Sequence, residues 1–90
     1  MKLDARLPWR VEWICYPSGY HDHRQFLNRE SAEKYFAEAL ADREWLETLH
    51  SIALQFVDFV SPGACFVHSV KIYRNDPENE RRVARAVQIR

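Results

Sequence analysis

Apolar and polar positions alternate along two stretches near the start of the chain, with the period of half-buried β-strands. In residues 9–16, Trp9, Val11, Trp13 and Cys15 alternate with Arg10 and Glu12. A turn is expected over residues 17–22, where Pro17 and Gly19 favour fixed or positive φ angles. Residues 23–27 are expected to form a shorter strand that closes a hairpin, with Phe26 on the face of the tryptophans.

An amphipathic helix is predicted over residues 29–41. Asn28 is a favourable N-cap, and Glu30 lies in the first turn, where the helix dipole stabilises an anion. The apolar positions that recur with helical spacing are Ala32, Tyr35, Phe36, Ala39 and Leu40.

Residues 42–60 fit two patterns. Asp42 can cap a second helix, and apolar residues from Leu46 to Val60 also occur at helical spacing. Ile52, Leu54 and Phe56, however, alternate with Ser51, Ala53 and Gln55, and β-branched and aromatic residues become frequent toward Val60. We favour a short helical turn over 42–47 and a strand over 48–60.

Two further strands are expected after a turn at residues 61–64. The strand over 65–74 is expected to carry Phe66, Val70 and Ile72 on one face, and Val67 and Tyr73 on the other. A loop over 75–79 and a strand over 82–89 follow, although Asp76-Pro77 can instead begin a helix over 77–86. The resulting order is ββαβββ (alternative ββααββ): one α+β domain, 1–90, whose small antiparallel sheet has one main helix on one face.

The predicted sheet has a second face, because one helix covers only one side. Its expected residues combine tyrosine, aliphatic and charged side chains, which suits a binding surface. They are Ile14, Tyr16, Leu27, Val67 and Tyr73, with Arg10, Glu12 and Lys71 between them. The alternative is that the N-terminus, a long loop or segment 42–60 covers this face.

Composition narrows the class of protein. The chain has 90 residues, of which 47% are apolar, and this is ample for a core. Surplus apolar surface would suit a protein partner or a homodimer. The first residues form no signal sequence and no apolar run approaches a membrane span, so we expect a cytoplasmic location and no membrane partner.

Charged residues are unevenly distributed although the formal net charge is zero. Acids predominate over residues 28–50, whereas bases predominate over residues 71–90. The plain interpretation is two solvated faces of opposite sign. The functional interpretation is a binding surface with an acidic and a basic part.

The candidates for metal binding or catalysis are weak. Cys15, His21, His23, Cys65 and His68 have zinc-ligand side chains, but Cys65 and His68 are three residues apart on a predicted strand and should point to opposite faces. Neither cysteine has an activating feature, no Gly-x-Ser-x-Gly motif occurs, and two glycines cannot build a phosphate-binding loop. We expect no enzyme activity, no metal and no cofactor.

Two binding functions remain, of which a protein-binding module is preferred. Nucleic-acid binding is the second, because Tyr73 lies among the basic residues of the C-terminal hairpin and can stack on a nucleobase.

In its size, α+β pattern and lack of enzymatic motifs the chain is similar to small phage or mobile-element inhibitors of host defence, such as anti-CRISPR proteins. That resemblance is one of type, without a shared motif. It implies that Glu33, Glu38, Asp42, Glu44 and Glu47 imitate nucleic-acid phosphates, although the basic C-terminal part departs from a purely acidic mimic. The candidate partner-binding residues are Tyr16, Tyr20, His23, Arg24, Glu33, Glu38, Asp42, Glu44, Glu47, Tyr73, Arg82 and Arg85.

Overall fold

Four antiparallel strands and two helices make up residues 3–60 and 64–72, the part of the chain that this computed structural model describes. In chain order they are β1 (Trp9–Cys15), β2 (His21–Phe26), α1 (Arg29–Ala41), α2 (Arg43–Leu46), β3 (Leu49–Asp58) and β4 (Ala64–Ile72). The α+β class, with one main helix between the second and third strands, is therefore confirmed. The strand predicted over 82–89, and its helical alternative, lie outside the described residues.

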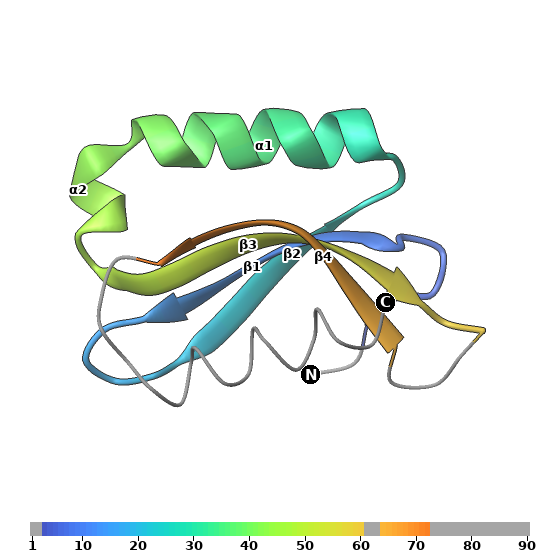
Figure 1. Cartoon of the computed structure of the whole chain (residues 1–90), viewed down its shortest axis with the longest axis horizontal. Coiled ribbons are helices and arrows are strands. Elements are labelled where there is room, and N and C mark those ends of the chain that lie inside the picture. The colour runs from blue at the N-terminus through green and yellow to red at the C-terminus, as the bar shows by residue number, and fades with distance from the viewer. Residues whose placement is uncertain (1–2, 61–63, 73–90) are drawn as a thin grey trace.

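The sheet has the order β2-β1-β3-β4, so that β1 and β3 are its central strands. Figure 1 shows α1 lying along one face of this sheet, with α2 at the end of α1 where the chain turns back into β3. Trp13 of β1 lies opposite Asp22 of β2 on one side and opposite Ile52 of β3 on the other.

Local signals set the bounds of both helices. The Asn28 side chain accepts a hydrogen bond from the Ser31 backbone N–H at 2.9 Å, as expected of an N-cap. Asp42 ends α1 and caps α2 by accepting from the Trp45 N–H at 3.2 Å. The chain then enters β3, which confirms the short helical turn and the strand favoured over residues 42–60.

The main core lies between α1 and the sheet. Val11, Leu49 and Ile52 are fully buried there, as is Ala32 of the helix, and Phe36 is 9% exposed. The aromatic residues of β1 and β2 (Trp9, Trp13 and Phe26) pack against this cluster, so the strand faces predicted for residues 9–16 and 23–27 are correct.

The faces predicted for β4 are wrong in part. Gln55 pairs with Val67 but Leu54 pairs with Ser69, so His68 is the extra residue of a β-bulge. Phe66 lies opposite Phe56, whereas Val70 lies opposite Ala53, on the other face of β3. The extra residue reverses the alternation, which is why Val70 shares a face with Val67 and not with Phe66.

The second face of the sheet is not the open surface that the sequence suggested. Ile14 and Val67 have relative exposures of only 4% and 5%, and Ala53 in the central strand has 6%. Ser51 and Gln55 on the same face are buried as well. Because a partner reaches only exposed side chains, this face is excluded as the contact surface at these positions.

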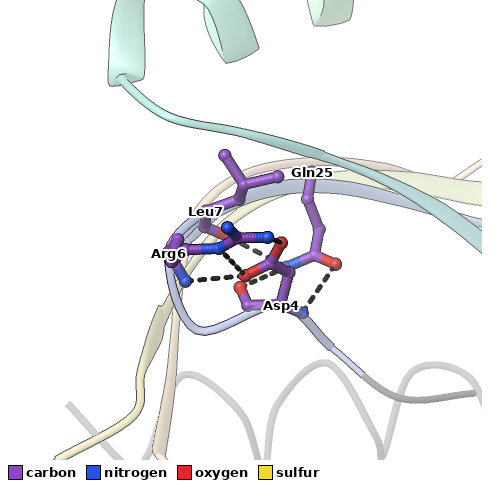
Figure 2. A network of polar contacts seen from close by, with 4 residues as sticks. All are labelled: Asp4, Arg6, Leu7 and Gln25. Atoms are coloured by element: carbon purple, nitrogen blue, oxygen red, sulfur yellow. Dashed lines mark hydrogen bonds and ion pairs between the residues drawn. The ribbon is translucent and has the colours of Figure 1, made fainter.

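The N-terminal segment covers part of this second face. Figure 2 shows the Gln25 side-chain amide donating to the carbonyl oxygens of Asp4 and Leu7, both at 2.9 Å, while its oxygen accepts from the Asp4 N–H. Arg6 donates to the Asp4 carboxylate, and this hydrogen bond holds the pKa of the Asp4 carboxyl below its usual value. The N-terminus was among the covers considered from the sequence.

Candidate partner-binding surface

The two hairpin tyrosines are exposed, as a binding role requires. Tyr16 is 48% exposed and Tyr20 is 59% exposed, in the turn between β1 and β2. The Tyr16 N–H donates to the Thr48 carbonyl at 2.7 Å, and its ring meets that of His50 edge-on at 4.8 Å. The turn therefore lies beside the start of β3, at the end of the molecule that carries α2 (Figure 1).

His23 and Arg24 lie within β2, in agreement with the strand predicted over residues 23–27. This strand begins at His21, earlier than predicted, because its ladder with β1 extends out to the pair Ile14 and His21. His23 is half-buried opposite Glu12 on the second face, whereas Arg24 lies on the helix face. The Arg24 guanidinium is 5.3 Å from the ring centroid of Tyr35, so these neighbours belong to different surfaces.

The predicted acidic residues all lie on or beside the two helices. Glu33 and Glu38 are exposed on α1, Asp42 lies at the junction, and Glu44 and Glu47 are exposed on or next to α2. Glu30 in the first turn of α1 is exposed too. We call these six carboxylates the acidic surface.

Three bases lie on the same helices as the acidic surface. Arg29 pairs with Glu33 across one helical turn, and Lys34 and Arg43 are exposed. Within residues 3–60 and 64–72, Glu38, Asp42 and Glu44 form no ion pair. Glu38 and Glu44 are thus available to a partner, and Asp42 can also bind one through the oxygen that does not cap α2.

A notch of about 350 Å³ opens into the acidic surface between the last two turns of α1 and the start of α2. Its lining is Tyr35, Glu38, Ala39, Asp42 and Trp45. Trp45 and Tyr35 are half-buried, while the two carboxylates are exposed. We refer to it as the notch.

Trp13 supports the aromatic side of the notch from the sheet. Its ring meets the Trp45 ring edge-on at 5.2 Å and lies 6.4 Å from the Tyr35 ring at a tilt of 35°. Tyr35 also contacts Phe26, at 5.3 Å between centroids. The aromatic lining is therefore held on the core and not on mobile surface side chains.

The sequence prediction included Glu38 and Asp42 but missed Tyr35 and Trp45 as site residues. The spacing i, i+3 and i+7 from Tyr35 to Glu38 and Asp42 already places these side chains along one face of a helix. Trp45 carried no such signal, because its position depends on the change of direction between α1 and α2. Tyr73, Arg82 and Arg85 lie outside the described residues.

A second polar cluster surrounds Arg10 on the other face of the sheet. Its guanidinium donates to Gln55 Oε1 at 2.7 Å, lies 3.8 Å from the Glu12 carboxylate and approaches Cys65 Sγ at 3.6 Å. Only 14% of the Arg10 side chain is exposed. Its hydrogen bonds serve the fold and leave little of the guanidinium for a ligand.

The residues considered for zinc do not converge. Cys65 contacts Arg10 on the second face, whereas the His68 ring lies 5.0 Å from Trp9, which packs on the helix face. Across residues 3–60 and 64–72, no three His, Cys, Asp or Glu side chains lie close enough together to hold a metal ion. Cys15 and Cys65 are both free thiols.

Over residues 3–60 and 64–72, the fold is a helical layer on one face of an antiparallel sheet, and the helices carry exposed carboxylates. In comparisons with known protein families, curated proteins and solved structures, the chain matches none of them. No helix in the described part of the chain is long and apolar enough to cross a membrane.

Proposed function

We propose that this chain is a non-enzymatic protein-binding module that binds a basic partner protein through its acidic surface. The observation that carries the proposal is the group of exposed carboxylates Glu38, Asp42 and Glu44, which have no ion-pair partner in the described chain. Complementary charge across an interface steers association and selects the partner.

A partner of this kind would be a protein that itself binds nucleic acid, because such proteins present clustered lysines and arginines. The module would then compete with nucleic acid for the same basic surface. This is the form of inhibition that the likeness to small phage or mobile-element inhibitors of host defence suggests.

The proposal is tested by affinity capture from lysate with a matched pair of variants. One variant combines Glu38→Gln, Asp42→Asn and Glu44→Gln; the other combines Lys34→Gln and Arg43→Gln, which lie on the same two helices. We expect the unaltered chain and the second variant to retain one defined basic protein. The first variant should bind it at least about tenfold more weakly, or about 1.4 kcal/mol.

The two variants separate a charge effect from a structural effect. Asn retains the capping oxygen at position 42 and Gln retains helix propensity, so circular dichroism should show unchanged folds. Equal capture by both variants, or repeated captures that recover no defined protein, would refute the proposal.

Nucleic-acid binding through the C-terminal bases is the second candidate. Lys71 is exposed on β4, while the remaining bases of that hairpin lie outside the described residues. Titration with DNA and RNA at two salt concentrations decides it, because phosphate contacts weaken steeply with salt.

A further inference from the structure

We propose that the notch binds the guanidinium of an arginine side chain that the basic partner presents. The inference rests on the proposed function and assigns one chemical group to one place on the acidic surface. Its lining combines two aromatic rings, Tyr35 and Trp45, with two carboxylates, Glu38 and Asp42.

Each part of the lining favours a planar cation. A guanidinium stacks on the face of Trp or Tyr within about 6 Å of the ring centroid and can bind a carboxylate with two parallel hydrogen bonds. Lysine lacks the planar donor fork, so arginine matches this combination better. A volume of about 350 Å³ leaves room for the side chain with its last methylene groups.

The end of α1 adds to the preference for a cation. The carbonyl groups of the last turn of a helix carry partial negative charge, and a basic side chain there is stabilising. α1 has no basic residue in its last turn, so this favourable position is not filled by the helix itself. Lys34 lies within α1 and Arg43 begins α2, and neither of these bases lines the notch.

The chain already places one arginine against this aromatic cluster. The Arg24 guanidinium lies 5.3 Å from the Tyr35 centroid and 5.9 Å from that of Phe26, on the β2 side. Arg24 does not line the notch. We infer that an incoming arginine binds mainly against Trp45, between the carboxylates of Glu38 and Asp42.

The test uses the full chain and a small probe, N-acetyl-arginine amide, with its neutral isostere N-acetyl-citrulline amide. The indole N–H signals of Trp9, Trp13 and Trp45 are followed by NMR. We expect the arginine probe to shift the Trp45 signal saturably at about millimolar concentration and to leave Trp9 unmoved, because Trp9 packs against Phe56 and His68 away from the notch. The citrulline probe should produce no saturable shift.

Paired substitutions control for general charge. Glu38→Gln with Asp42→Asn should weaken probe binding at least about fivefold, while Glu30→Gln with Glu33→Gln, earlier on α1, should change it less than about twofold at physiological salt. A Trp45 signal that does not move, equal effects of the two pairs, or an equal response to citrulline would overturn the proposal. An equal response to N-acetyl-lysine amide would overturn the assignment to arginine.

The same variants separate this inference from the proposed function. In one outcome, the Glu38/Asp42 pair and the Glu30/Glu33 pair weaken partner capture alike and the probe does not bind. The partner then binds the acidic surface as a whole, and the assignment of arginine to the notch fails. If no basic partner is captured while the probe still binds at Trp45, the proposed function fails and the notch remains an arginine-binding site.

Discussion

Gly19 holds the turn between β1 and β2 in a conformation that other residues rarely adopt. Its φ angle is +73°, and nothing lies within 4 Å of the position where a Cβ atom would be. The penalty of a side chain is therefore purely conformational. We expect Gly19→Ala to lower the free energy of unfolding by about 1 kcal/mol, measured by urea titration.

The matched control is D-alanine at position 19, introduced by chemical ligation. A D-residue favours positive φ, and the space around the Cβ position is open, so stability should equal or exceed that of the glycine chain. Equal destabilisation by both enantiomers would show that steric contact, and not φ, decides.

Features that depend on single residues and their neighbours were predictable. The cap at Asn28, the acidic first turn and the turn at Pro17 and Gly19 each depend on interactions within a few positions. The opposed directions of Cys65 and His68 were predicted correctly too, although the bulge at His68 was not. A bulge depends on the register between two paired strands, and this register cannot be inferred from the sequence of one strand alone.

At the scale of elements, the sequence predicted where β3 lies but not that both of its faces are buried. This strand lies between β1 and β4, and its helix face carries fully buried Ile52, while Ala53 on the opposite face is only 6% exposed. Alternation alone cannot separate a strand buried on both faces from a half-buried one when the second face carries small and polar residues such as Ser51 and Gln55. For this reason the predicted exposure was wrong at Ile14 and Val67, whereas Tyr16 and Leu27 are exposed as predicted.

The burial of the second face gives a sharp prediction. Ala53→Glu places an uncompensated carboxylate in a site with almost no exposure, and we expect the free energy of unfolding to fall by about 3 kcal/mol or more. Ser69→Glu on β4 is the matched control, because Ser69 is exposed and should accept the same side chain within about 0.5 kcal/mol. Similar urea midpoints for both variants would show that the second face is accessible after all.

At the scale of the whole molecule, the sequence predicted an acidic candidate surface but not the notch within it. The acidic bias of residues 28–50 indicated which elements would carry negative charge, because charged side chains on a surface helix are mostly exposed. The notch requires α1 and α2 to meet at an angle and requires Trp13 of a distant strand to support Trp45. That arrangement follows from tertiary packing and could not be inferred from one segment.

The charge distribution predicts how binding depends on salt. The chain has no net charge, so attraction of a basic partner must come from the local acidic surface and not from a global field. Exposed charges are screened beyond the Debye length, which is about 10 Å at 0.1 M salt. Raising sodium chloride from about 50 mM to about 300 mM should therefore weaken binding of the captured partner by about tenfold, mainly through a slower association rate in surface plasmon resonance.

The control is the chain with Glu38→Gln, Asp42→Asn and Glu44→Gln. The logarithm of its dissociation constant should change with salt by less than half as much as that of the unaltered chain. A dissociation constant that does not change with salt would mean that apolar contacts, such as those of exposed Tyr16 and Tyr20, hold the partner instead.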